Sequence, residues 1–421
     1  MTKTAYDAIV VGARCAGAAA AICLARAGLR VLLTDRGAFP SDIPHGHFIR
    51  RHGPARLRRW GLLDHLLATG CPPIATWLTD LDDGVVVAND LVVDGVPSAI
   101  GPRRTVLDAL LVDVAIASGA EFRERWSVEE VIRDGDRVVG IRGREAGTGN
   151  LSAEHTTITV GADGRRSKIA RLVTAEVLEY RPAMTCWYFS YWSGIESPGL
   201  ELYQRNASTL FAFPTSNGLF AVFAAWPASR LEEVRVAPAR SIEALVAEVP
   251  SLADRMCASR RVERISGATD LPNFRRRAAG PGWALVGDAA CHKDPYLALG
   301  ICDALRDAEF LAHSVTTRRS IDAALAEYDR THDAATQRDF AENIRRAALG
   351  PVAPAVLRLR SALRRDPAAA RAFHLATEGM IDPEHFFNVT NLRALVGNDV
   401  PAPLLETFAA NEVSRVRYGN V

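Results

Sequence analysis

An aspartate, a charged loop and the expected start of a helix follow one another closely in WALVGDAACHKDPYLALGICDALRDAE, residues 283–309. A short apolar run ends at Gly287, and Asp288 follows it directly. His292 lies in the loop beyond, and a helix is expected to begin near Gly300. A carboxylate accepts hydrogen bonds from ligand hydroxyls, and a helix N-terminus attracts negative charge. The segment is therefore either a ligand site or a plain junction in which Asp288 caps the helix.

A second segment of this kind lies near the start of the chain. Residues 5–11 (AYDAIVV) predict a buried strand, and the Ala-rich residues 12–28 predict a helix. Residues 29–36 (LRVLLTDR) predict a second strand that ends in an acid, Asp35. This order is typical of a dinucleotide site, in which helix N–H groups meet a pyrophosphate and the acid meets a ribose diol. An unrelated Ala-rich crossover is the alternative.

The residues of this glycine turn have separate tasks. Gly12 permits the tight turn, and Gly17 lets the helix lie close to the strand. Asp35 lies 23 residues beyond Gly12, at the spacing of an acid that binds ribose. Arg14 stands where the middle glycine of GxGxxG is usual, so the motif is incomplete.

Two further segments combine glycine, acid and arginine. Residues 156–171 (TTITVGADGRRSKIAR) predict a strand, the turn that holds Asp163, and a basic turn into a helix. Residues 101–122 predict an amphipathic helix with Arg103 and Arg104 at its start.

Together these motifs resemble the flavoprotein monooxygenases of the para-hydroxybenzoate-hydroxylase type, near their halogenase and geranylgeranyl-reductase branches. That superfamily has a glycine-rich FAD motif, a central GADG-type motif and a late GD motif, and this chain keeps their order over roughly residues 5–310. The resemblance implies an α/β fold, in which a Rossmann-like FAD-binding domain is interleaved with a mixed β-sheet substrate domain and followed by C-terminal helices. The implied segments are FAD-binding parts at 1–80, 101–175 and 276–330, substrate-domain strands at 81–100, a β-sheet substrate domain at 176–275, and a C-terminal helical region at 331–421.

The resemblance also implies which residues hold non-covalent FAD. Asp288 would bind the ribityl hydroxyls, and the helix that begins near Gly300 would direct its N-terminus at the isoalloxazine. Arg104, with Arg103 as the alternative, would reach the phosphates, and Asp163 would support the site and take part in NAD(P)H use. The full implied set is Gly12, Ala13, Arg14, Ala16, Gly17, Asp35, Arg36, Arg104, Asp163, Gly287, Asp288, Pro295 and Gly300. Cys302 and Leu297 depart from the family pattern of Asn and Gly.

Aromatic strands form the expected substrate domain. Residues 185–194 (TCWYFSYWSG) place aromatic side chains on both faces of a strand, and residues 209–226 predict a hairpin that turns at Asn217–Gly218. Tyr191 and Phe213 are candidate pocket residues, although strand aromatics are more often core. His47 is a third candidate. His292 is the candidate catalytic residue, with His45 or His47 as alternatives, and each is weighed against a structural histidine.

The family resemblance implies an NAD(P)H-dependent monooxygenase that forms a flavin C4a-hydroperoxide with oxygen. Its substrate would be a small aromatic or polycyclic molecule of secondary metabolism. The alternatives are an FAD-dependent reductase of an isoprenoid or other apolar substrate, and a non-catalytic FAD-binding protein. A halogenase is rejected, because the WxWxIP motif is missing and no lysine lies between Lys3 and Lys168.

Composition limits the remaining possibilities. The 421 residues are 48% hydrophobic and 24% charged with a net charge of +1, which favours roughly two soluble domains and no nucleic-acid partner. Seven cysteines without metal spacing predict free thiols in a reducing cytoplasm and no metal site. No apolar run reaches membrane-spanning length, and we expect no signal peptide. The basic residues 50–60 are expected to form a solvated helix face. The oligomeric state stays open.

Overall fold

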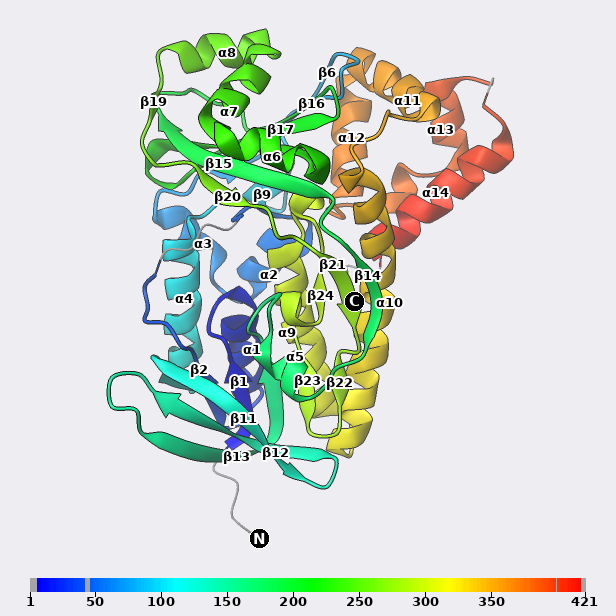
Figure 1. Ribbon diagram of the computed structural model, residues 1–421. Helices are drawn as coiled ribbons and strands as arrows, with labels where there is room; N and C mark the ends of the chain where they lie inside the picture. Colours follow the sequence, from blue (N-terminus) through cyan, green and yellow to red (C-terminus); the bar gives the residue numbers. More distant parts are fainter. Residues whose placement is uncertain (1–5, 42–45, 399, 418–421) are drawn as a thin grey trace.

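A parallel sheet carries the dinucleotide motif in the computed structural model, which describes residues 6–41, 46–398 and 400–417 (Figure 1). Strands β10, β2, β1 and β13 lie side by side in parallel, and β23 pairs with β13. The antiparallel strands β12, β11 and β22 extend this sheet. Their bounds are β1 Tyr6–Val11, β2 Val31–Thr34, β10 Glu121–Arg123, β11 Trp126–Asp134, β12 Arg137–Glu145, β13 Leu151–Gly161, β22 Ala279–Gly280 and β23 Trp283–Leu285.

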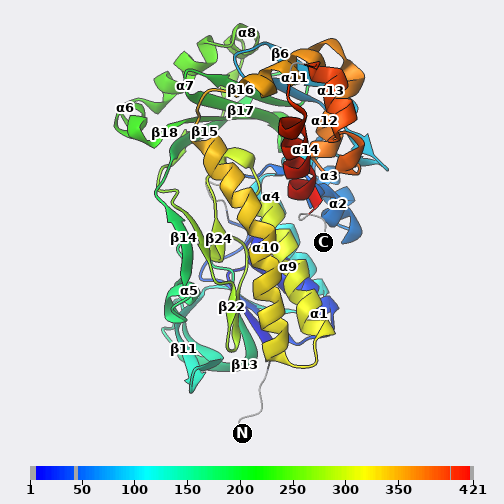
Figure 2. The same cartoon turned by 90° about the vertical axis from the view of Figure 1, so that its right-hand side faces the viewer.

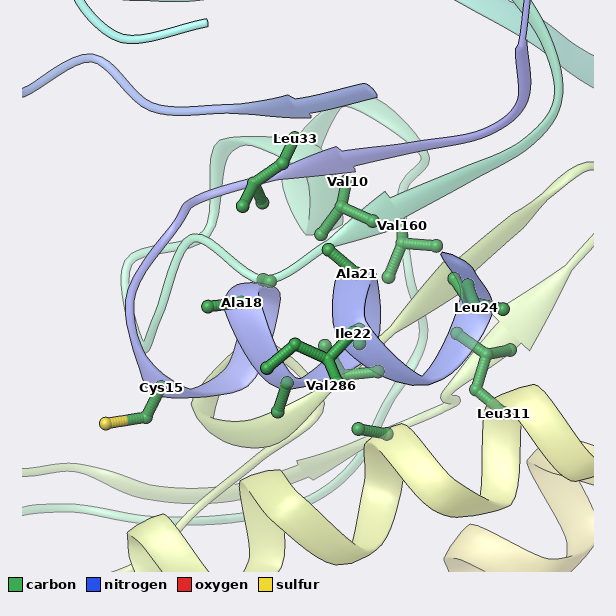
Figure 3. Close-up of a cluster of buried hydrophobic side chains, with 14 of the residues drawn as sticks. Val10, Cys15, Ala18, Ala21, Ile22, Leu24, Leu33, Val160, Val286 and Leu311 are labelled. Carbon is green, nitrogen blue, oxygen red and sulfur yellow. The ribbon is translucent and has the colours of Figure 1, made fainter. Parts of the chain in front are cut away.

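Helix α1 (Cys15–Arg26) lies between this sheet and helix α9 (Gly300–Thr317), as Figure 3 shows. Ala18 and Ala21 of α1 are fully buried against the strands. Their short side chains let the helix approach the sheet closely, which places the start of α1 beside the ends of β1 and β13. Helices α4 (Arg104–Ala117) and α10 (Ile321–Ala347) pack against α1 and α9 respectively, and Figure 2 shows α10 running beside α9 toward the upper part of the molecule.

A second, largely antiparallel sheet forms the upper part of the molecule (Figure 1). Its order is β19-β15-β18-β17-β16-β5-β6, with β20 also on β15. Asn217 turns the β17–β18 hairpin in the left-handed region at φ 64°, as the sequence predicts. The bounds are β5 Trp77–Asp80, β6 Val85–Ala88, β15 Thr185–Ser193, β16 Leu200–Arg205, β17 Ser208–Thr215, β18 Leu219–Pro227, β19 Arg260–Arg261 and β20 Ser266–Ala268.

Strand β15 sends alternate side chains into two separate cores. Cys186, Tyr188 and Trp192 pack on one face beneath α6 (Leu231–Val236), α7 (Pro238–Ala247) and α8 (Pro250–Cys257). Trp187, Phe189 and Tyr191 pack on the other face, in a core that also contains residues of the C-terminal helices. Those helices are α11 Pro354–Arg365, α12 Pro367–Thr377, α13 Val389–Val396 and α14 Ala402–Arg417 (Figure 2).

Short strands connect the two parts. Strands β14 (Val177–Arg181), β21 (Asn273–Arg276) and β24 (Cys291–His292) form one small sheet, and β3 (Ile49–Arg50), β9 (Ala99–Ile100) and β4 (Pro73–Ile74) form another. Strands β7 (Val92–Val93) and β8 (Val96–Pro97) pair alone. The remaining helices are α2 His52–Arg59, α3 Leu63–Ala68, α5 Lys168–Leu172, and the single 3-10 turns η1 Ser216–Gly218, η2 Ala228–Arg230, η3 Gly287–Ala289, η4 Pro295–Leu297 and η5 Pro383–His385.

The basic cluster at residues 50–60 does not form the solvated face that the sequence predicts. Arg56 of α2 is 3% exposed and pairs with Glu309 at 2.7 Å, and Arg51 is buried on Asp339 at 2.9 Å. Arg59 alone of these three is exposed. The prediction is wrong for the buried members because their acidic partners come from α9 and α10, far away in the sequence. Among the described helices, none is long and apolar enough to cross a membrane.

Candidate cofactor and substrate site

The glycine turn after β1 brings three segments into direct contact. A Cβ on Gly12, whose φ is +100°, would lie 2.6 Å from the carbonyl oxygen of Ala162 in the GADG turn. A Cβ on Gly17 would lie 1.6 Å from the carbonyl oxygen of Gly12. Both contacts are closer than any side chain allows, so glycine is required here. The turn, the start of α1 and the GADG turn therefore form one close-packed corner.

Asp35 is fixed at the end of β2 by two backbone groups. One carboxylate oxygen accepts a hydrogen bond from Ala13 N–H at 2.8 Å, and the other accepts one from Gly37 N–H at 2.7 Å. A carboxylate has further lone pairs beyond these two bonds. Asp35 thus ties its loop to the glycine turn and keeps the capacity to accept hydrogen bonds from a ribose diol.

Two arginines gather on one buried carboxylate at the start of α1. Arg104 donates to Asp108 at 2.8 Å, and Arg14 donates to the same carboxylate at 3.0 Å. The second arm of Arg14 reaches Ser41 at 2.9 Å, and the thiol of Cys15 donates to Asp108 at 3.1 Å. Two guanidinium groups share the carboxylate of Asp108 beside a helix N-terminus, so Asp108 neutralises only one of the two positive charges, and a pyrophosphate could meet the other.

Asp163 turns its carboxylate toward the chain itself. Its oxygens accept hydrogen bonds from Lys168 N–H at 2.6 Å, from Ile169 N–H at 3.2 Å and from the hydroxyl of Ser167. These groups belong to the start of α5. Asp163 therefore shapes the turn that touches Gly12, and its part in cofactor or NAD(P)H binding stays a prediction.

Asp288 has a different environment. It lies half-buried in η3, and among the described residues no hydrogen bond to its carboxylate is found. A Cβ on Gly300 would lie 3.8 Å from one of its oxygens, so the carboxylate is directed toward the start of α9. The N-cap residue of α9 is Leu299, which makes no side-chain cap bond. Asp288 is thus not the helix cap that the plain-junction alternative requires, and its oxygens are available to a ligand.

The loop between Asp288 and Gly300 is held by its own polar residues. Asp294 accepts hydrogen bonds from Tyr296 N–H at 3.1 Å and from the hydroxyl of Thr185, and Pro295 begins η4. His292 is buried in β24, where Nδ1 contacts the carbonyl oxygen of Pro272 and the ring lies 5.7 Å from that of Phe274. The catalytic role of His292 stays a prediction.

The three candidate pocket residues lie together. Tyr191 Oη is 2.9 Å from His47 Nε2, and the ring centroids of His47 and Phe213 are 5.2 Å apart. His47 Nδ1 lies 3.0 Å from the carbonyl oxygen of Gly101, which can only accept, so Nδ1 carries the proton and Tyr191 donates to Nε2. Burial and the nearby Arg103 lower the pKa of His47 to about 3, so its ring is neutral. His45 lies outside the described residues.

Arg103 and Phe223 complete this group; the sequence indicates Arg103 as the alternative phosphate arginine and Phe223 only as part of the aromatic hairpin. The Arg103 guanidinium lies 3.9 Å from the centroid of the Tyr191 ring and pairs with Glu263 at 2.8 Å. The Phe213 and Phe223 rings are stacked at 5.7 Å with an angle of 9°. The hairpin pattern could have indicated Phe223, because alternate residues of paired strands share one face. Among the described residues, no three metal-ligating side chains lie together.

Comparison with known proteins agrees with this geometry. A family model described as the FAD binding domain matches residues 5–338. Digeranylgeranylglycerophospholipid reductase 1 of Methanococcoides burtonii is 26% identical over 319 residues, which make up 72% of this chain and 72% of the reductase. Aklavinone 12-hydroxylase DnrF of Streptomyces peucetius subsp. caesius is 31% identical over 186 residues, 40% of this chain and 37% of the hydroxylase.

The fold is also found among solved structures. That of the myxobacterial chondrochloren halogenase CndH superposes with a TM-score of 0.74 at 20% identity, covering 97% of this chain and 98% of that one. At this identity the likeness describes the fold alone.

Proposed function

The chain belongs to the FAD binding domain family and is an FAD-dependent oxidoreductase, and from this premise we propose that it is an NAD(P)H-dependent monooxygenase of a flat aromatic substrate. The observation that carries the proposal is the aromatic wall of the substrate sheet, where the polar pair of His47 and Tyr191 lies beside the stacked rings of Phe213 and Phe223. Rings of this kind bind a planar ligand face to face or edge to face.

The residues present fit FAD. The close-packed corner at Gly12 leaves the α1 N-terminus open to a pyrophosphate, with Arg14 and Arg104 supplying positive charge. Asp35 would accept hydrogen bonds from the ribose hydroxyls, and Asp288 would accept them from the ribityl hydroxyls, since both carboxylates keep free lone pairs. Ala13, Ala16, Gly17, Arg36, Gly287, Pro295 and Gly300 complete the proposed set.

When bound, FAD supplies the redox chemistry: it takes electrons from NAD(P)H and activates oxygen. The residues of this chain would bind and orient the substrate and exclude water from it. The neutral His47 accepts a hydrogen bond from the hydroxyl of Tyr191, and the Arg103 guanidinium covers the same ring, so a substrate hydroxyl would meet the Tyr191 oxygen as a fixed acceptor. The apolar core shared with the C-terminal helices keeps water away from that pair.

The reductase relatives motivate a second candidate function. Their similarity extends over 72% of this chain, and the same apolar core would accept an isoprenoid chain. The missing WxWxIP motif still argues against a halogenase. The likeness to the solved halogenase structure describes the fold alone.

Flavin content and oxygen uptake test the proposal. We expect about one non-covalent FAD per chain and oxygen consumption driven by NADH or NADPH, with hydrogen peroxide released when no substrate is present. Labelled oxygen should enter the product of an aromatic substrate. A product that gains two hydrogens and no oxygen would favour the reductase. A well-folded chain that cannot be reconstituted with FAD would contradict both candidates.

A further inference from the structure

Four charged side chains lie buried at the first turns of α9, three of them from α9 itself. Lys293, from the loop after η3, pairs with Asp303 of α9, and Arg306 pairs with the same aspartate at 2.8 Å. Arg306 also pairs with Asp307 at 2.8 Å. Each of the four side chains is at most 9% exposed. We call these residues the charge quartet; two cations and two anions give it a net charge of zero.

The charge quartet joins the proposed flavin loop to α9 at two places. Asp307 accepts a hydrogen bond from the backbone N–H of Gly287 at 3.0 Å, just before Asp288. Lys293 holds the far side of the same loop through Asp303. The quartet is therefore close to Asp288, the carboxylate that we assign to the ribityl hydroxyls of FAD, and to the helix end that this carboxylate faces.

The net charge of the quartet has a strong effect here because its surroundings contain little water. In a buried site, an unpaired charge acts over a longer distance than it does in solvent, whereas a tight pair of opposite charges largely cancels. The positive end of the α9 dipole adds to whatever net charge lies beneath it. Loss of one member of the pair would leave a full charge of known sign at that place.

We propose that the Lys293–Asp303 ion pair sets the midpoint potential of the bound FAD by keeping the charge beneath the α9 N-terminus at zero. The inference rests on the proposed placement of FAD at this end of α9. Reduction puts two electrons, supplied by the reductant, on the flavin. A positive charge nearby favours the electron-rich form and a negative charge opposes it.

The two members of the pair therefore predict shifts of opposite sign. Lys293→Met leaves Asp303 short of one partner and should lower the midpoint potential. Asp303→Asn removes one of the negative charges that face Lys293 and Arg306, while Asp307 and Asp339 remain, and should raise the midpoint potential, most clearly in mildly acidic solution, where a buried lysine that has lost its ion pair keeps its proton. The double variant restores zero charge and should return close to the wild-type potential.

The measurement is a reductive titration of each purified, FAD-loaded protein against a reference dye. Lys168→Met is the matched control, because Lys168 is an exposed lysine on α5 and should leave the potential unchanged. If the pair were only structural, both single variants would be less stable, but their midpoint potentials would not shift in opposite directions. If Lys293→Met does not retain FAD, the midpoint potentials of Asp303→Asn and of the double variant still test the inference.

Two outcomes overturn the inference. One is a shift of the same sign, or no shift, in both single variants; the other is a double variant that stays far from the wild-type value. A wild-type protein that binds no FAD at all would instead contradict the proposed function, so the two failures are distinguishable.

Discussion

Three aspartates in glycine-rich turns have separate partners. Asp35 binds two backbone N–H groups of neighbouring turns, Asp163 binds the start of α5, and Asp288 has no hydrogen-bond partner among the described residues. The same side chain therefore links two turns at Asp35, accepts hydrogen bonds from the first turn of a helix at Asp163, and is free to accept them from a ligand at Asp288. Substitution should separate these roles.

Asp288→Ala should weaken FAD binding and leave the stability of the apoprotein nearly unchanged. A hydrogen bond to a charged group contributes about 1.5–3 kcal/mol, which corresponds to roughly a ten- to hundredfold loss of affinity. Asp163→Ala is the contrasting variant, because it removes the acceptor of two N–H groups in the first turn of α5, a loss comparable to that of a helix cap, about 1 kcal/mol of unfolding free energy. Flavin fluorescence titrations and melting curves measure the two effects. A drop in apoprotein stability for Asp288→Ala equal to that for Asp163→Ala would contradict the assignment.

His47 should make the folded state sensitive to acid. Its pKa falls from 6.5 to about 3 on burial, so between these values the unfolded chain binds a proton that the folded chain does not. Stability is therefore complete above the unfolded value and falls as the pH drops below it, by up to about 1.4 kcal/mol per pH unit.

His47→Gln should reduce this slope, measured by denaturant unfolding at several pH values. His52, whose pKa burial also lowers to about 3, keeps part of the slope in the variant. A slope that is identical in the wild type and the variant would show that His47 already takes a proton in the folded state.

The β1–α1 unit depends at the element scale on the small residues at its contact. Gly12 and Gly17 leave no room for a Cβ, and Ala18 and Ala21 are fully buried between the sheet and α9 (Figure 3). Close approach is what brings the N–H groups of α1 to the edge of the sheet where a pyrophosphate can reach them.

Gly17→Ala should therefore disturb both packing and cofactor binding. The added methyl group would lie 1.6 Å from the Gly12 carbonyl oxygen, so the helix must move away from the turn. Overpacking of this kind costs about 1–3 kcal/mol of stability. Gly350→Ala is the control, because nothing lies within 4 Å of its Cβ position. Thermal unfolding and FAD titration of both variants are the measurements, and a stable, fully loaded Gly17→Ala protein would refute the close contact.

At the scale of the whole molecule, the C-terminal helices close one face of the substrate sheet. Asp83, in the turn between β5 and β6, accepts hydrogen bonds from Arg360 at 3.0 Å and from Arg364 at 2.7 Å. Arg50 of β3 pairs with Glu378 at the end of α12. Ion pairs at two separate places thus connect residues 354–417 to the β5–β6 turn of the substrate sheet and to one of the connecting strands.

Asp83→Asn should loosen α11 before the rest of the chain. Removing the charged partner of a buried arginine costs up to about 3–5 kcal/mol, because Arg360 keeps its hydrogen bonds to Thr79 and Gly84 but loses its opposite charge. Hydrogen exchange should therefore accelerate in α11 and in its contacts with β6, while the α1–α9 core stays protected. Asp82→Asn is the matched control, since Asp82 is 70% exposed and its nearest arginine is 3.7 Å away. Equal exchange in both variants would contradict a role for Asp83 in holding the helices.

The sequence alone indicates the order of the FAD motifs, the α/β class, the turn at Asn217 and the start of α9 at Gly300. These features depend on local causes: glycine at positive φ, apolar periodicity, and motif spacing along a single strand–turn–helix unit. The sequence also indicates His47, Tyr191 and Phe213 as candidate pocket residues, and the fold places these three in contact. The segment boundaries and the catalytic role of His292 stay predictions, and the oligomeric state stays open.

Only the tertiary structure decides which charges are buried and which carboxylate is open. Arg51 and Arg56 read as a solvated basic face, yet their partners Asp339 and Glu309 arrive from elements more than 250 residues away. The pairing of Lys293 with Asp303 likewise follows from the path of one loop over α9. The cost of burying a charge depends on the partner it finds in space, and spacing along the chain does not contain that information.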